Sequence, residues 1–266
     1  MLIRISIILF AAFLTNLPVN GQEIGLRLQS LRHQFKEDAE GTMQKVKEMG
    51  FTQVELESTY GLTFPEFIKL LAINNLNVIS YATSLERLEK SPQSVVDEAR
   101  SYGARYIVCS SFLEGNEFTK EDADHTTTVL NDAGKILARN GLLLCYQPQD
   151  FELQPNETQT LFDYLVAKVE KRYVHFEMDV FLVKQAGQDP VALLKKYPTR
   201  FVLMNLRDRK SGTSKPNVAL GKGDVGIANV MKIAKELGIQ YFFIEDESPK
   251  SEQQIPESLA FLKSLN

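Results

Sequence analysis

The chain has 266 residues, of which 44% are hydrophobic and 24% charged, and its formal net charge is −4 at pH 7. This length suits one domain of about 250 residues built from eight strand–helix units. The mild acidity, without clusters of Lys or Arg, argues against nucleic acid or an anionic membrane surface as a partner.

The first residues have the pattern of an export signal. Arg4 supplies a positive charge, residues 5–14 are mostly apolar, and small residues precede Gln22. The apolar run is too short to span a bilayer, so it predicts a secretory signal peptide rather than a membrane helix. We therefore expect residues 1–21 to be removed on export, to a periplasm or to the exterior, leaving one domain over residues 22–266. No other apolar run in the sequence is long enough to cross a membrane.

Short apolar runs rich in β-branched and aromatic residues predict eight strands. In chain order they cover residues 24–28, 53–56, 77–81, 106–109, 142–146, 174–178, 201–204 and 241–244. Segments with helical periodicity lie between them, among them residues 42–49, 64–74, 131–140 and 227–237. Strands that alternate with helices form parallel βαβ units. With no GxGxxG after the first strand, the sequence predicts a single closed (β/α)8 barrel, a TIM barrel, rather than an open dinucleotide-binding sheet.

The chain contains two cysteines and three histidines. Cys109 and Cys145 each lie inside a predicted strand, where a cysteine usually acts as a small apolar residue. We therefore expect buried thiols rather than a disulfide. None of the histidines is well placed for a multi-histidine metal site, and no motif of a Ser/His/Asp or Cys/His triad is recognisable.

Polar side chains follow five of the predicted strands. The carboxyl ends of all strands in a parallel barrel open on the same face, and side chains alternate along a strand. Polar residues of matching parity are therefore expected to meet at this mouth, and they are Glu55, Gln147, Gln149, Asp179, Asn205, Arg207 and Glu245. Carboxylates and amides around one cavity can bind sugar hydroxyls, coordinate an oxygen-loving cation, or place a base beside a C–H bond.

Each of these features also has a purely structural interpretation. Asp179 fits the N-cap of the next helix, and Glu177, deeper in its strand, fits a buried acid with its hydrogen bonds satisfied. Arg207 and Asp208 fit an ion pair that fixes the seventh loop. Residues 221–224 fit a tight loop whose glycines adopt positive φ.

Several segments resemble the sugar phosphate isomerase/epimerase family, the xylose isomerase-like TIM barrels. The similar segments are residues 24–32, 54–57, 176–180, 188–190, 220–224 and 243–248. The resemblance covers nearly all of the chain after residue 21 and implies the same barrel, with a sugar or sugar derivative as substrate. In this family a divalent cation at the barrel mouth polarises the sugar while a carboxylate moves a proton.

The positions that the resemblance implies for metal ligands are Gln147, Asp179, Asn205 and Glu245. Asp179 and Glu245 match the family, whereas Gln147, Gln149 and Asn205 stand where histidines are typical. Amide oxygens are weak, neutral ligands compared with imidazole nitrogens. We therefore expect either one weakly bound divalent cation, Mg²⁺, Mn²⁺ or Ca²⁺, or no metal.

Together these features predict an exported enzyme that moves a proton next to a sugar carbonyl, as an isomerase or epimerase does. The candidate residues are Glu245 and Asp179 for proton transfer, and Glu55, Gln147, Gln149, Asn205 and Arg207 for substrate binding. Two alternatives remain open. One is a metal-independent lyase or hydratase acting on a keto-sugar, and the other is a barrel that binds a sugar without turning it over.

Overall fold

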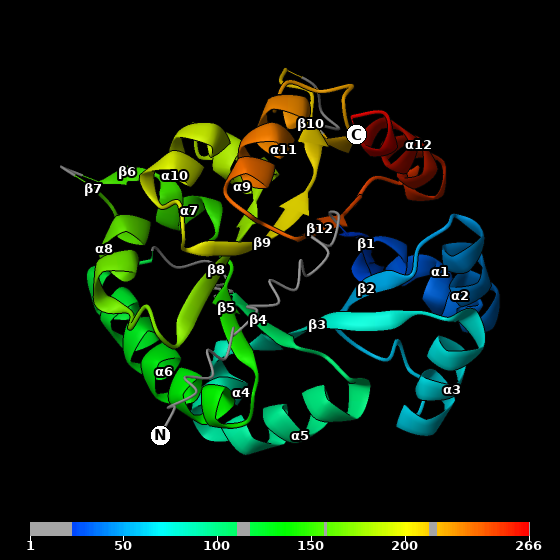
Figure 1. Ribbon diagram of the computed structural model, residues 1–266, viewed down its shortest axis with the longest axis horizontal. Coiled ribbons are helices and arrows are strands. Elements are labelled where there is room, and N and C mark those ends of the chain that lie inside the picture. The colour runs from blue at the N-terminus through cyan, green and yellow to red at the C-terminus, as the bar shows by residue number, and fades with distance from the viewer. Residues whose placement is uncertain (1–22, 111–117, 157–158, 213–216, 266) are drawn as a thin grey trace, which may run out of the picture.

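The computed structural model describes residues 23–110, 118–156, 159–212 and 217–265. Eight parallel strands close into a barrel in the order β1-β12-β9-β8-β5-β4-β3-β2, and helices surround it (Figure 1). The barrel strands are β1 (Glu23–Arg27), β2 (Gln53–Leu56), β3 (Asn77–Ser84), β4 (Tyr106–Ser110), β5 (Leu143–Tyr146), β8 (Val174–Asp179), β9 (Phe201–Leu206) and β12 (Tyr241–Ile244). The predicted closed (β/α)8 barrel is confirmed, while the predicted signal peptide lies outside the described residues.

The helices of the outer layer follow the strands in turn. They are α1 (Arg32–Glu37), α2 (Ala39–Glu48), α3 (Phe64–Asn74), α4 (Leu85–Lys90), α5 (Pro92–Tyr102), α6 (Lys120–Arg139), α7 (Asp150–Leu153), α8 (Leu161–Lys168), α9 (Val180–Gln185), α10 (Pro190–Lys196), α11 (Ile227–Glu236) and α12 (Ser251–Lys263). The remaining elements are a 3-10 turn, η1 (Leu28–Leu31), and two short antiparallel pairs, β6 (Pro155–Asn156) with β7 (Gln159–Thr160) and β10 (Asp208–Arg209) with β11 (Asn217–Val218).

The main departures from the predicted elements are earlier helix starts and later strand ends. α6 begins at Lys120 rather than at residue 131, because Thr119 and Asp122 form a capping box there. α2 begins at Ala39 because the Asp38 side chain accepts a hydrogen bond from the Gly41 N–H. β9 continues to Leu206, two residues past the predicted end, because Asn205 stays paired with its neighbouring strands.

The apolar core lies between the barrel and its helices, and a second, smaller cluster fills the barrel itself. That interior cluster consists of Tyr106, Val108, Cys145, Leu203 and Phe243. A Cβ at Gly25 would lie 2.8 Å from the Phe243 ring, so the absence of a side chain there makes room for that ring in the cluster. Both cysteines are buried thiols, as predicted.

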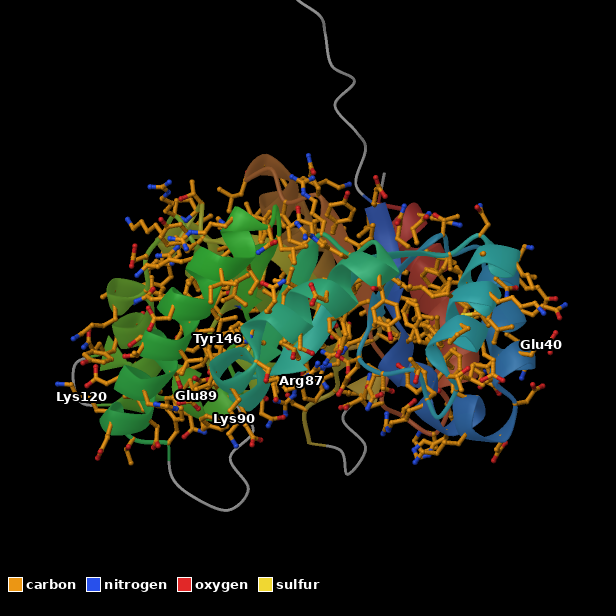
Figure 2. All side chains as sticks on the ribbon, turned by 90° about the horizontal axis from the view of Figure 1, so that it is seen from below. Glu40, Arg87, Glu89, Lys90, Lys120 and Tyr146 are labelled. Atoms are coloured by element: carbon orange, nitrogen blue, oxygen red, sulfur yellow. The ribbon has the colours of Figure 1, made fainter. Side chains whose placement is uncertain are left out.

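Charged side chains cover the outside of the molecule. Glu40, Lys90 and Lys120, on α2, α4 and just at the start of α6, lie at its periphery (Figure 2). Among the described helices, none combines the length and the apolar character needed to cross a membrane.

Candidate functional site

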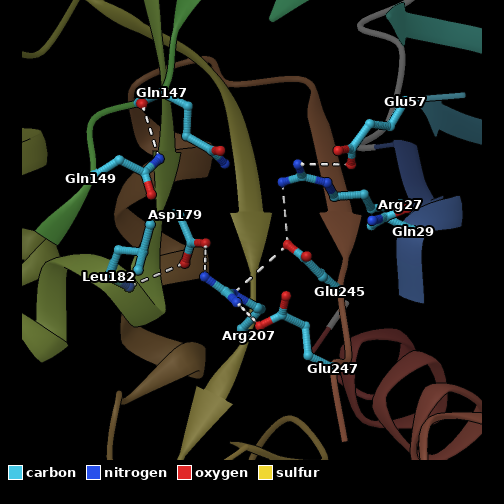
Figure 3. A pocket seen from close by; sticks show the side chains of 10 residues that line it. All are labelled: Arg27, Gln29, Glu57, Gln147, Gln149, Asp179, Leu182, Arg207, Glu245 and Glu247. Carbon is cyan, nitrogen blue, oxygen red and sulfur yellow. Dashed lines mark hydrogen bonds and ion pairs between the residues drawn. The ribbon is translucent and has the colours of Figure 1, made fainter. Parts of the chain in front are cut away.

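A polar cavity of about 280 Å³ opens at the carboxyl ends of the barrel strands. It is lined by Arg27, Gln29, Glu57, Gln147, Gln149, Asp179, Leu182, Arg207, Glu245 and Glu247 (Figure 3). All of these except Leu182 are polar or charged. In a TIM barrel this is the end at which the loops and strand ends assemble active sites.

The alternation of side chains along the strands explains why these residues meet. Residues of one parity point into the barrel, and the apolar interior ends one step below the mouth. Two residues beyond Cys145 lies Gln147, two beyond Leu203 lies Asn205, and two beyond Phe243 lies Glu245. The convergence of Gln147, Asp179 and Glu245 on one cavity, predicted from parity, is observed.

Arg27 connects three strands at the mouth. Its register partner on β2 is Glu55, and its Nε lies 3.3 Å from Glu55 Oε1. Its Nη1 lies 3.3 Å from Glu245 Oε2, and its Nη2 lies 3.5 Å from Glu57 Oε2. The residue is 8% exposed, so its charge is compensated by carboxylates rather than by water.

Arg207 makes a second set of ion pairs across the cavity. Its Nη2 donates to Asp179 Oδ2, and its Nη1 donates to Glu247 Oε2 over 2.6 Å. Its Nε lies 3.7 Å from Glu245 Oε2. The guanidinium also lies over the Phe181 ring at 4.7 Å, which fixes its plane.

Glu245 is held by one oxygen and left open at the other. Its Oε2 accepts hydrogen bonds from Arg27 and Asn205 and lies near Arg207, whereas among the described residues none donates to Oε1. Burial by itself raises the pKa of Glu245, but Arg27, Arg207 and the Asn205 amide together lower the pKa below its ordinary value. Glu245 is therefore an ionised carboxylate in a site where it is only 5% exposed.

Asp179 serves a helix and the cavity at once. Its Oδ1 accepts hydrogen bonds from the backbone N–H groups of Phe181 (2.9 Å) and Leu182 (3.2 Å), so the expected N-cap interpretation is correct. Its Oδ2 binds Arg207. Burial raises the pKa of Asp179, although Arg207 and the capping hydrogen bonds oppose that shift. With both oxygens engaged, Asp179 is better suited to hold Arg207 than to exchange protons.

Glu55 and Glu177 form a carboxyl pair in the barrel interior, below the cavity. Both are 0% exposed, and the Ser80 hydroxyl donates to Glu55 Oε2 over 2.5 Å. No described donor serves either oxygen of Glu177. Burial raises the pKa of Glu177 well above its ordinary value, and the neighbouring Glu55 charge adds to that shift. Glu177 is therefore protonated and shares a hydrogen bond with Glu55, in line with its interpretation as a buried structural acid.

The two glutamines after β5 form another wall of the cavity. The Gln147 amide is buried, and its Nε2 has no acceptor among the described residues. Gln149 Nε2 donates weakly to the Gln147 carbonyl over 3.4 Å. A buried N–H group without a partner is costly, so Gln147 is ready to bind an acceptor oxygen of a ligand.

The family model of xylose isomerase-like TIM barrels matches residues 43–265. The chain belongs to this family. No functionally curated protein matches its sequence significantly.

Several solved structures share the fold of this chain. Two sugar phosphate isomerase/epimerase structures from Parabacteroides distasonis ATCC 8503 superpose with a TM-score of 0.78. One has 20% identity and covers 92% of this chain and 96% of its own, and the other has 21% identity and covers 91% and 98%. The probable 3-DHS dehydratase AsbF, involved in petrobactin synthesis in Bacillus anthracis, has a TM-score of 0.72 and 15% identity, covering 92% and 100%. At these identities the likeness establishes the fold alone.

The donor set at this xylose isomerase-like mouth does not suit a divalent cation. Asp179 and Glu245 already compensate Arg207, and Asn205 turns its amide N–H, not its oxygen, toward Glu245. Within the described part of the chain, no three His, Cys, Asp or Glu side chains are grouped to hold a metal ion. Neutral amides and already paired carboxylates are poor ligands even for Mg²⁺ or Ca²⁺.

The structure places the predicted site residues at two depths. Gln147, Gln149, Asp179, Arg207 and Glu245 line the cavity. The other two, Glu55 and Asn205, are fully buried beneath it and reach a ligand only through the residues that they orient.

Sequence reasoning missed Arg27, Glu57 and Glu247 as site residues. The sequence did contain a signal for each of them. Glu57 and Glu247 have the same parity as the predicted site residues Glu55 and Glu245, and Arg27 lies at the end of β1. The predicted ion pair between Arg207 and Asp208 is wrong, because the Asp208 carboxylate instead accepts backbone N–H groups of its own loop.

Proposed function

We propose that the protein is an exported, carbohydrate-active enzyme that moves a proton next to a sugar carbonyl, as an isomerase or epimerase does. The observation that carries this proposal is the asymmetry of Glu245. Its Oε2 is fixed by Arg27 and Asn205, while its Oε1 has no donor among the described residues. A carboxylate oriented through one oxygen and open at the other is the arrangement of a general base.

The cavity suits a small polyol. Its volume of about 280 Å³ is close to the lower end of ligand pockets, and its lining is almost entirely polar. Guanidinium and amide N–H groups together with carboxylate oxygens match the alternating donors and acceptors of sugar hydroxyls. The two Parabacteroides structures named as sugar phosphate isomerase/epimerase make a sugar the natural first class of substrate to test.

In the proposed reaction, Glu245 Oε1 removes the proton from the carbon next to the carbonyl. The electron pair of that C–H bond forms a carbon–carbon double bond, and the carbonyl π pair moves to its oxygen. Arg27 and Arg207 face the resulting enolate with N–H groups, and Gln147 Nε2 binds a neighbouring oxygen. For an isomer, the hydroxyl proton on the deprotonated carbon passes to the former carbonyl oxygen, and Glu245 returns its proton to the former carbonyl carbon. For an epimer, the deprotonated carbon instead receives a proton from water on its opposite face, and Glu245 passes its own proton to solvent.

A second candidate is elimination of water from a keto-sugar. It is favoured by the arginine pairing of Asp179 and Glu245, because a ketone already acidifies the neighbouring C–H bond and needs less electrophilic assistance. Glu245 would take the proton, and the hydroxyl on the next carbon would leave as water after receiving a proton from an acid at the rim. Glu247, hydrogen-bonded to Arg207 on the same cavity, is positioned for that second role.

Proton exchange tests the proposal without knowledge of the final product. The mature protein is incubated in D₂O with panels of aldoses, ketoses and keto-sugars, and the C–H signals next to the carbonyl are followed by proton NMR. We expect at least one sugar to exchange, and Glu245→Gln to slow exchange by at least about a hundredfold. Glu252→Gln, an exposed glutamate paired with Lys45 on the outside, is the matched control and keeps full exchange.

Two results would count against the proposal. Exchange that persists in a folded Glu245→Gln protein removes the base from the mechanism. Saturable sugar binding by calorimetry without exchange of any tested sugar favours the barrel that binds without turnover.

A further inference from the structure

We propose that the guanidinium of Arg207 takes the place of the divalent cation that the family fold implies at this mouth. The proposal concerns the electrostatics of the site, and only its catalytic part rests on the proposed function. Its basis is that Arg207 already lies where a shared cation would have to lie, between Asp179 and Glu245.

The contacts of Arg207 are those of a bridging cation. One nitrogen binds Asp179, a second binds Glu247 at 2.6 Å, and the third lies 3.7 Å from Glu245. A planar guanidinium can serve several carboxylates in fixed directions, which a lysine ammonium cannot do as well. The side chain is 8% exposed, so water contributes little to this balance.

Burial makes the replacement of Arg207 by a metal ion costly. The Asp179 and Glu245 side chains are only 1% and 4% exposed, so both depend on protein donors for their compensation. A metal ion would have to displace the guanidinium, which would then be left buried without its partners. Arg27 brings a second positive charge to the same Glu245 oxygen, Oε2, at 3.3 Å, and would repel an incoming cation.

The amide of Asn205 supports the same conclusion. Its Nδ2 donates to Glu245 Oε2, the oxygen nearest to both arginines. Turning the amide so that its oxygen faces the cavity centre would lose that hydrogen bond and bring two acceptor oxygens together. Asn205 is therefore fixed as a donor to Glu245 and not as a metal ligand.

Arg207 also has the donors to serve the reaction. A guanidinium carries five N–H groups, and the bonds to Asp179 and Glu247 use two of them. Since Arg207 lines the cavity, a remaining N–H of Nη1 or Nη2 can bind the substrate oxygen on which negative charge develops. This N–H group would stabilise the negative charge by hydrogen bonding, and Arg207 would not itself be changed in the reaction.

Titration with Mn²⁺ in the absence of substrate tests the replacement. We expect the wild-type protein to bind Mn²⁺ more weakly than about 1 mM. In Arg207→Met, Asp179 and Glu245 lose their shared cation, and we expect Mn²⁺ affinity to rise at least about tenfold, which is about 1.4 kcal/mol. Electron paramagnetic resonance of free Mn²⁺ and calorimetry both measure this directly.

Arg209→Met is the matched control. Arg209 lies over the same Phe181 ring, at 5.4 Å, but forms no ion pair with Asp179 or Glu245 in the described structure. Its Mn²⁺ affinity should equal that of the wild type. Tighter binding in Arg207→Met that disappears on adding Asp179→Asn would place the new ion between the freed carboxylates.

The proposal fails if the wild-type protein binds one Mn²⁺ tightly and Glu245→Gln abolishes that binding, or if a folded Arg207→Met gains no affinity. The titration of the wild-type protein does not depend on the variant, so tight Mn²⁺ binding there would contradict the proposal even if Arg207→Met does not fold. Because no substrate is present, a failure of the exchange assay sinks the proposed function alone, and tight wild-type Mn²⁺ binding sinks this inference alone.

Discussion

The Asp208 carboxylate organises the loop between β11 and α11. It accepts hydrogen bonds from the N–H groups of Gly221 (2.9 Å), Gly223 (3.0 Å) and Val225 (3.2 Å). Because Asp208 is 1% exposed, these donors replace the water that it has lost. Gly221 has φ +82°, as predicted for this loop, whereas Gly223 is required for space, since a Cβ there would lie 2.2 Å from the Arg209 carbonyl oxygen.

We expect alanine at Gly223, where space is short, to lower the free energy of unfolding more than alanine at a glycine that is needed only for its positive φ. Gly223→Ala forces apart the backbone of Arg209 and the Asp208 carboxylate, which should cost about 3 kcal/mol of unfolding free energy. Gly238→Ala, at φ +80° with nothing within 4 Å of the new Cβ, should cost about 1 kcal/mol. Urea unfolding of the two variants measures both, and equal losses would contradict the steric argument.

At the scale of elements, the short helix α7 controls one wall of the cavity. Its Glu152 is 0% exposed and accepts hydrogen bonds from the Gln149 N–H (2.7 Å) and the Tyr146 hydroxyl (2.5 Å). This ties the start of α7 to the end of β5 across the segment that carries Gln147. Burial raises the pKa of Glu152 from 4.5 to about 8, against the opposing effect of these hydrogen bonds.

The shifted pKa of Glu152 predicts a pH dependence of stability with a defined sign. The folded protein holds this proton up to about pH 8, whereas the unfolded chain releases it near 4.5. The folded state therefore binds more protons between these values, and the contribution of Glu152 falls as pH rises through that window, by up to about 1.4 kcal/mol per pH unit. Above pH 8 it stays at its lower level.

Comparison with Glu152→Gln isolates this contribution from those of the other buried acids. The unfolding free energy is measured by urea titration from pH 4.5 to pH 9 for both proteins. We expect the variant to lose less stability than the wild type as pH rises. Parallel curves would show that Glu152 does not carry a proton in the folded state.

At the scale of the whole molecule, the closed barrel wall protects both thiols. Cys109 on β4 packs toward the helices, and Cys145 on the adjacent β5 packs into the barrel interior. Burial raises the pKa of each thiol, so neither is ionised at neutral pH. A reagent reaches them only when the wall opens.

We therefore expect no reaction of the native protein with Ellman's reagent on the time scale of minutes, and reaction of both thiols on unfolding in guanidinium chloride. The slow native reaction should have the same rate in Cys145→Ala, where only Cys109 remains, if the wall opens as one cooperative unit. Rapid labelling of a single thiol in native buffer would indicate local opening at β4 or β5 instead.

The barrel and part of the composition of its mouth follow from local sequence patterns. Alternating strand and helix signals require parallel pairing, and side-chain alternation then forces Gln147, Asp179 and Glu245 onto one face. These are local properties, readable from a few neighbouring residues. The start of α6 was predicted too late, because the capping box at Thr119 extends this helix beyond the apolar pattern that was read from the sequence.

The pairing of the charges, by contrast, depends on the folded barrel. Arg27 meets Glu245 across 218 positions of sequence because β1 and β12 close the barrel, and the register sets Leu26 beside Ile244. Arg207 pairs with Asp179 and Glu247 rather than with its neighbour Asp208, because the Asp208 carboxylate accepts backbone hydrogen bonds from its own loop. Ion-pair choice depends on the register of distant strands and on burial, and neither is encoded in local spacing. For that reason the sequence predicted Asp179, Glu245 and Arg207 as site residues but neither the way they pair nor the part played by Arg27.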